Sequence, residues 1–147
     1  DTLVGFFGIN EKPTSSKDPF ALRRTAIGLL RTITENNLTV QLKDLINYSI
    51  VTYEEQNVKF INDSTFRDVI LFLKERFKNI LREKKIRSDI IEAVDASHVS
   101  NDFLILYNKC SILNKNITKD ICKKIIGTYK RASNIIDQEL KTKKEIL

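Results

Sequence analysis

The sequence predicts an all-α protein, a bundle of six helices. Apolar residues recur at helical spacing along most of the 147 residues, and several of these stretches follow a residue type that caps helices. No stretch alternates apolar and polar residues for long enough to predict a strand. With 41% hydrophobic residues, a chain of this length can bury a core.

The first helix is predicted over residues 19–35. The carboxylate of Asp18 can accept hydrogen bonds from the first-turn amides, and Pro19 suits the first helical position, where an N–H would lack a partner anyway. Residues 1–17 are expected to be loop-like after an apolar start, because Gly and Pro punctuate them. The inward face of this helix is predicted to carry Phe20, Ala26, Ile27, Leu30 and Ile33.

Two further helices are predicted on either side of a polar connection over residues 54–63. Thr39 can cap the earlier helix, and residues 62–64 offer caps for the later one. The later helix is the clearest amphipathic segment, because its apolar and basic residues take separate positions. The predicted inward residues are Leu42, Leu45, Ile46, Ser49, Ile50 and Tyr53 in the earlier helix and Phe66, Val69, Ile70, Leu73, Phe77, Ile80 and Leu81 in the later one.

Three more helices complete the prediction. Ser88 is expected to cap a short helix, Ser100 to cap another, and Thr118 to open a long final helix. The long helix has an apolar stripe at helical spacing, which we expect to face inward. The stripe consists of Ile121, Ile125, Tyr129, Ala132, Ile136 and Leu140.

The net positive charge is confined to the second part of the chain. Residues 1–61 hold 7 basic and 7 acidic residues, whereas residues 62–147 hold 18 basic and 12 acidic ones, so the whole net charge of +6 lies there. Such an excess indicates a surface that faces a polyanion. A nucleotide bias toward Lys codons would produce a similar excess, since 17 of the 25 basic residues are Lys.

Several function classes are excluded or disfavoured by what the sequence lacks. No apolar run reaches the roughly 18 residues of a membrane span, and no secretory signal opens the chain. Cys110 and Cys122 lack a metal-type spacing and are expected to be reduced thiols of a cytoplasmic protein, while His98 is the only imidazole. Motifs of hydrolases and nucleotide-binding loops are absent, so we expect a binding or structural module without a complete active site, cut from a longer protein.

Two basic clusters could bind a polyanion. The first basic cluster, at the end of the third predicted helix, would equally well complement the negative end of the helix dipole. In the second basic cluster, on the final helix, Lys123, Lys130 and Asn134 share one face, and Tyr129 could stack on a base, although its place in the apolar stripe favours the core. The first cluster comprises Arg82, Lys84, Lys85 and Arg87, and the second comprises Lys123, Lys124, Lys130, Arg131 and Asn134.

Longer motifs point to a family. Residues 12–24, KPTSSKDPFALRR, closely resemble the signature of the β subunit of bacterial two-subunit glycyl-tRNA synthetase. The preceding DTLVGFFGI is similar to the end of that subunit's HD-type helical domain. Further on, the segments LKDLINYSIVTY, FLKERFKNILREK and GTYKRASNII resemble its subsequent helices, the last two in a DALR-type anticodon-binding domain. The resemblance spans nearly the whole chain in the family's order.

The resemblance implies a division of labour between subunits. Residues 1–61 would be the end of the HD-type body with its helical tail, and residues 62–147 would be a truncated anticodon-binding domain. In the family, an α subunit carries the class II catalytic core that uses ATP, Mg²⁺ and glycine, while the β subunit holds tRNA(Gly) within a heterotetramer. No cofactor is therefore expected in this fragment.

The resemblance also assigns roles to individual residues. A family motif matches Lys130, Arg131 and Asn134. The resemblance therefore favours the second basic cluster as a surface that faces RNA. Asp18, Pro19, Arg23 and Arg24 belong to the structural signature, where the two arginines are expected to pair with acidic groups. Ser15 stands where the family usually has Gly, so the turn before Asp18 is expected to differ.

The sequence leaves three functions open for the chain. The leading hypothesis is a tRNA-binding part of a glycine–tRNA ligase β subunit, which supports catalysis on the α subunit. The second is a helical protein-interaction module with no RNA role. The third is a degenerate HD hydrolase, which the missing His–Asp metal pair disfavours.

Overall fold

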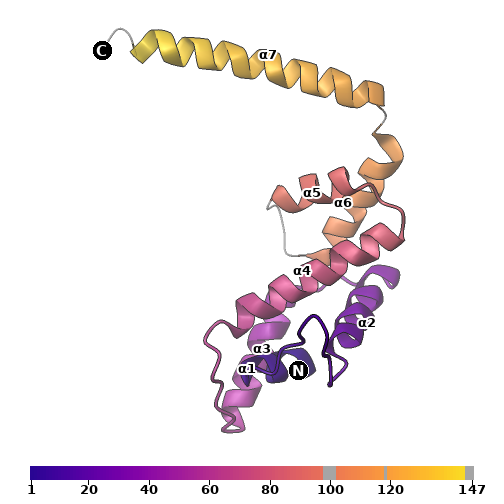
Figure 1. Cartoon of the computed structure of the whole chain (residues 1–147), viewed down its shortest axis with the longest axis vertical. Coiled ribbons are helices and arrows are strands. Elements are labelled where there is room, and N and C mark those ends of the chain that lie inside the picture. Colours follow the sequence, from indigo (N-terminus) through magenta and orange to yellow (C-terminus); the bar gives the residue numbers. More distant parts are fainter. Residues whose placement is uncertain (98–101, 118, 145–147) are drawn as a thin grey trace. The chain divides into compact units, whose positions relative to one another are not determined.

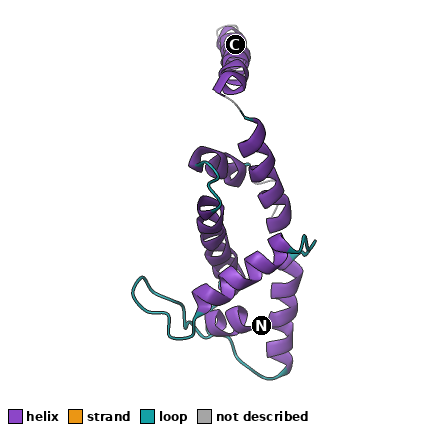
Figure 2. Cartoon of the chain, turned by 90° about the vertical axis from the view of Figure 1, so that its right-hand side faces the viewer, coloured by secondary structure: helices purple, strands orange, loops and turns teal. Residues whose placement is uncertain are grey.

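The structure, a computed structural model, describes residues 1–97, 102–117 and 119–144. Over these residues the chain is all-α, as predicted, and contains no strand (Figure 2). It has two compact units, Asp1–Asn114 and Lys115–Leu147. The helices are α1 (Thr2–Gly8), α2 (Leu22–Glu35), α3 (Leu42–Glu55), α4 (Thr65–Glu83), α5 (Ser88–Ala96), α6 (Phe103–Asn116) and α7 (Lys119–Lys144).

Helix α1 coincides with the apolar start of the chain and was not among the six predicted helices, so the prediction missed it. Its 7 residues are too few to display a helical period, and a helix of this length is unstable on its own. It is stabilised by burial of Leu3, Val4 and Phe7 against α2, α3 and α4. The Phe7 and Phe72 ring centroids lie 5.2 Å apart.

Two glycines let α1 approach its neighbours closely. A Cβ on Gly5 would lie 2.5 Å from the Tyr53 hydroxyl oxygen, and one on Gly8 would lie 2.5 Å from the Phe60 ring. Real Cβ atoms do not lie that close to other atoms, so both positions require glycine, which has no side chain. The residues responsible come from α3 and the connection after it, far away in sequence.

Helix α4 is the centre of the first unit. Figure 1 shows it running between α1, α2 and α3 on one side and α5 and α6 on the other. It packs against α1, α2 and α5, and the edge of the Phe77 ring meets Phe103 of α6 at a centroid distance of 5.0 Å. One hydrophobic core therefore includes residues from both sides of residue 61. The predicted division into family domains at that position stays a prediction.

Several helix starts differ from the prediction. Helix α2 begins at Leu22 instead of residue 19, because Ala21 adopts a left-handed φ of 52° and leaves Pro19 and Phe20 in the preceding turn. Helix α3 follows Gln41 instead of Thr39, and Ser88 is the first residue of α5 rather than its cap. Ser100 and Thr118 lie outside the described residues. The described cap of α6 is Asp102, whose Oδ1 accepts hydrogen bonds from the amides of Leu104 (2.9 Å) and Ile105 (3.1 Å).

Helices α1 to α4 end with the same kind of turn. One residue after the C-cap takes a left-handed φ, and the next amide donates to the carbonyl five residues back, as in a Schellman motif. Three of the left-handed residues are asparagines, a type that tolerates this conformation. The four residues are Asn10, Asn37, Asn57 and Lys85.

Candidate nucleic-acid interface

Helix α7 carries the second basic cluster on one face. Its 26 residues extend for about 39 Å at 1.5 Å per residue (Figure 1). Lys123, Lys130 and Asn134 follow one another at offsets of seven and four, so they lie almost in line along the helix. All three side chains are exposed, as are Lys124 and Arg131 beside them.

The cations of the second basic cluster have no anionic partner among the described residues. Six ion pairs are present in that part of the chain, and none includes Lys123, Lys124, Lys130 or Arg131. The Nε of Arg131 instead donates to the backbone carbonyl of Gly127, at 3.3 Å. Four positive groups are thus available to a polyanion along one stretch of helix.

The apolar stripe of α7 does not face inward as predicted. Ile125 is 59% exposed, Tyr129 72% and Ile136 58%. Ile121 and Ala132 are also exposed, and the side chain of Leu140 lies outside the described part. The reason is that α7 is the one long helix among the described residues of the unit 115–147, so no second long helix in that described part covers the stripe. Tyr129 is therefore accessible for stacking, the role the sequence had disfavoured.

The first basic cluster differs because most of its members already have partners. Arg82 donates to the Asn79 side chain at 3.0 Å. Lys84 lies over the Tyr107 ring, with its Nζ 4.8 Å from the ring centroid and 3.3 Å from the Tyr107 hydroxyl. These contacts tie the end of α4 to the adjacent α6.

Arg87 and Lys85 complete the first basic cluster. The Arg87 guanidinium binds the Asp89 carboxylate through two nitrogens, with Nε donating to Oδ1 at 3.1 Å, and these hydrogen bonds lower the pKa of Asp89. The side chain of Lys85 makes no hydrogen bond or ion pair among the described residues. The residue holds the left-handed turn that ends α4, with a φ of 59°, and its amide donates to the Arg82 carbonyl at 2.9 Å. The cluster therefore stabilises the α4–α5 connection.

The signature residues form a structural turn. Asp18 caps α2, with Oδ1 accepting from the amide of Leu22 at 2.8 Å and Oδ2 from that of Arg23 at 3.1 Å. The Arg23 guanidinium lies 3.9 Å from the same carboxylate and donates to the carbonyl of Thr14. Pro19 is exposed in the turn, and Arg24 is exposed without a described ion pair. The signature thus fastens the loop before α2 to its first turn.

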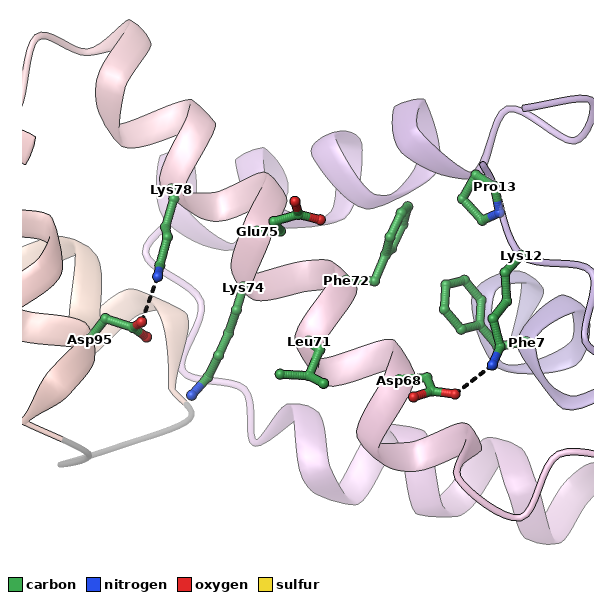
Figure 3. A pocket seen from close by; sticks show the side chains of 10 residues that line it. All are labelled: Phe7, Lys12, Pro13, Asp68, Leu71, Phe72, Lys74, Glu75, Lys78 and Asp95. Atoms are coloured by element: carbon green, nitrogen blue, oxygen red, sulfur yellow. Dashed lines mark hydrogen bonds and ion pairs between the residues drawn. The ribbon is translucent and has the colours of Figure 1, made fainter. Parts of the chain in front are cut away.

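A surface pocket of about 490 Å³ lies across α4 (Figure 3). An ion pair stands at each end of it, Lys12 with Asp68 and Lys78 with Asp95, both at 2.6 Å. Between them the lining is largely apolar, with Phe7, Pro13, Leu71 and Phe72. The Lys12 hydrogen bond, with a second one from Asn62, lowers the pKa of Asp68. With two of its three lysines already paired, this pocket is a poor site for a polyanion.

The described residues offer no metal centre and no membrane-spanning helix. No group of three or more His, Cys, Asp or Glu side chains in that part of the chain could hold a metal ion. Cys110 and Cys122 are both free thiols, and burial raises the pKa of Cys110. None of the described helices is long and apolar enough to cross a membrane.

Comparison with known proteins shows which protein family the chain belongs to. The model of the family described as "Glycyl-tRNA synthetase beta subunit" matches residues 1–96. The chain is 40% identical to the glycine–tRNA ligase β subunit of Rickettsia canadensis over 95% of its length, and 36% identical to that of Rhodospirillum centenum over 96%. The names of the family and of these relatives are those of aminoacyl-tRNA synthetase subunits, which belong to the ligase class of enzymes. Within that class, the chain belongs to the glycyl-tRNA synthetase β-subunit family.

The chain corresponds to a small share of its relatives. It spans 20% of the Rickettsia protein, 19% of the Rhodospirillum protein and 20% of the corresponding β subunit of Acinetobacter baumannii, to which it is 36% identical. The family model ends at residue 96, before α7, whereas the alignments with the relatives cover nearly the whole chain. The second basic cluster therefore lies beyond the segment that the family model matches.

Proposed function

We propose that this chain is the tRNA-binding part of a glycine–tRNA ligase β subunit. The observation that carries the proposal is the second basic cluster, four exposed cations on α7 with no anionic partner among the described residues. Membership of the β-subunit family supplies tRNA as the polyanion. The relatives' names support the family but say nothing of which surface meets RNA.

The mechanism is indirect. Lys123, Lys124, Lys130 and Arg131 neutralise phosphates and position the tRNA along α7. Asn134, with both a donor and an acceptor on its side chain, tests the edge of an anticodon base, and Tyr129 offers a ring for stacking. This placement would present the acceptor end of tRNA(Gly) to an α subunit, where ATP and glycine would react with Mg²⁺ as the metal cofactor. In this proposal the β subunit acts in the cytoplasm, within a heterotetramer that it forms with the α subunit.

The salt dependence of tRNA binding tests this proposal. Replacing Lys123, Lys130 and Arg131 together by Ala in the assembled ligase should weaken binding and reduce the slope of log K against log salt by about two. The matched control replaces Arg82, Lys84 and Arg87 by Ala, which removes the same charge from the first basic cluster. We expect the control to change the slope by less than about one. An unchanged slope for the α7 triple variant would remove α7 from the tRNA contact.

A second function, binding of a protein partner, is favoured by the outer face of α3. Leu45 is 48% exposed, Tyr48 71% and Val51 50%, and they lie three residues apart on one side of the helix. Leu45 was predicted to face inward, but Leu42 and Ile46 take that side. If the chain is only a protein-interaction module, both triple variants will leave tRNA binding unchanged, while replacing Tyr48 with Ala will weaken capture of the α subunit.

A further inference from the structure

Gly127 is a helical glycine that the fold does not require. Gly5 and Gly8 are needed because neighbouring rings occupy the space of a Cβ. At Gly127 a Cβ would meet only the Nη2 of Arg131, at 3.9 Å, which is an ordinary van der Waals distance. Its φ is not in the left-handed region either. A helix interior of this kind favours alanine over glycine.

Gly127 lies in the middle of the second basic cluster. It lies one turn after Lys123 and one turn before Lys130 and Arg131, on the face that continues to Asn134. The bare backbone is thus surrounded by the unpaired cations of the second basic cluster. Arg131 also donates to the Gly127 carbonyl, which keeps its guanidinium beside the gap.

We propose that Gly127 is the point of closest approach between α7 and the sugar–phosphate backbone of tRNA. This inference rests on the proposed function and identifies where on the second basic cluster the RNA lies. Without a Cβ, the RNA backbone can come against the helix surface, where Lys123 and Lys130 reach phosphates on either side. A side chain at position 127 would hold the RNA away from both.

The charges favour RNA over a packed protein helix at this place. A neighbouring helix that used Gly127 for close packing would bury Lys123, Lys130 and Arg131, and buried cations without partners are strongly unfavourable. A polyanion instead supplies the missing negative charge at every contact. Most of the large aliphatic residues of α7, which suit a protein neighbour, lie on the opposite side of the helix from Gly127, among them Ile121, Ile125 and Ile136.

Gly28 provides a matched control. It also lies inside a helix, with nothing within 4 Å of a Cβ placed on it, and arginines stand four residues before it and three after. There, however, Arg31 is engaged by Glu83 of α4 at 3.3 Å. Nothing in the structure explains the glycine at position 28. Thr128, exposed on another side of α7, supplies a second control on the same helix.

The test measures tRNA(Gly) affinity of the assembled ligase at fixed salt for a series of growing side chains. We expect Gly127→Ala to weaken binding by a few-fold and Gly127→Leu by about tenfold or more, although both substitutions favour the helix. Gly28→Leu and Thr128→Leu should leave the affinity within about twofold. Circular dichroism should show helix content that is unchanged or raised in all four variants.

The outcomes separate this inference from the proposed function. If the α7 triple variant weakens binding but Gly127→Leu does not, the close approach is wrong and the proposed function stands. If the triple variant itself binds normally, the proposed function fails and this inference with it. Loss of α-subunit assembly in Gly127→Leu with unchanged tRNA affinity would show that a protein packs there, and equal losses in Gly28→Leu would also overturn the inference.

Discussion

The two basic clusters look alike in the sequence but differ in the folded chain. At the end of α4, Arg82, Lys84 and Arg87 are engaged by an amide, a tyrosine ring and a carboxylate of the same unit. On α7, the cations have no anionic partner among the described residues. Charge density alone therefore does not identify a binding surface, since what matters is whether the protein already satisfies the charge.

The same contrast holds for the apolar residues of the two helices. Eight residues of α4 are buried, with neighbours on more than one side, whereas the large hydrophobics described on α7 are 42% exposed or more. Helix α4 is thus part of the scaffold, and α7 presents both its faces. This difference makes testable predictions about which substitutions affect stability and which affect binding.

The largest effect is expected from truncating a buried residue of α4. Leu73→Ala should lower the free energy of unfolding by about 2–5 kcal/mol, because Leu73 is 1% exposed and its removal leaves a cavity. Ile125→Ala in α7, where the side chain is 59% exposed, should change it by no more than about 0.5 kcal/mol. Urea unfolding of the chain measures both. Similar losses for the two variants would mean that α7 belongs to the same buried core.

A smaller effect is expected on the pH dependence of folding stability. It tests whether the Lys12–Asp68 ion pair of the first unit contributes to that stability. The hydrogen bond from Lys12 lowers the pKa of Asp68 below its ordinary value of 3.8. The carboxylate therefore stabilises the fold above that value, and this contribution is lost as the pH falls through the lowered pKa. Lys12→Met should reduce the stability that the chain gains as the pH rises from below the lowered pKa of Asp68 to above its ordinary value.

The control for this prediction is Lys124→Met, which removes a cation with no described ion pair. The Lys124→Met variant should show the same loss of stability at low pH as the chain without a substitution. Thermal unfolding of both variants across the acid range gives the comparison. If Lys12→Met and Lys124→Met have the same acid profile, the Lys12–Asp68 pair contributes nothing to pH-dependent stability.

The sequence predicted the long helices well because their periods are long enough to read. The third predicted helix, expected to follow caps at residues 62–64, is α4 at Thr65–Glu83, and the final long helix is α7. The sequence missed α1, since its stability comes from packing against α2, α3 and α4, and its close neighbours Tyr53 and Phe60 lie more than 40 positions away. The shift in the start of α2 comes from the left-handed Ala21, a conformation that no residue preference predicted.

The candidate site was predicted in part. The sequence alone predicted that Lys123, Lys130 and Asn134 share one face, because their spacing of seven and four residues on a helix determines this. Whether a cation is already paired depends on tertiary neighbours, so the sequence could not separate the two clusters. Gly127 was overlooked, although a glycine inside a helical pattern is itself a signal. The exposure of Tyr129 depends on what covers α7, and no local pattern encodes that.

Photo-crosslinking from two exposed asparagines tests the central claim most directly. A photoreactive amino acid is placed at Asn134 in the second basic cluster or at Asn79 beside the first, and the assembled ligase is irradiated with labelled tRNA(Gly). We predict a crosslink from position 134 that excess unlabelled tRNA suppresses, and none from position 79. Crosslinking from position 79 with none from position 134 would contradict the account, because the tRNA would then lie against the cluster whose charges are already paired.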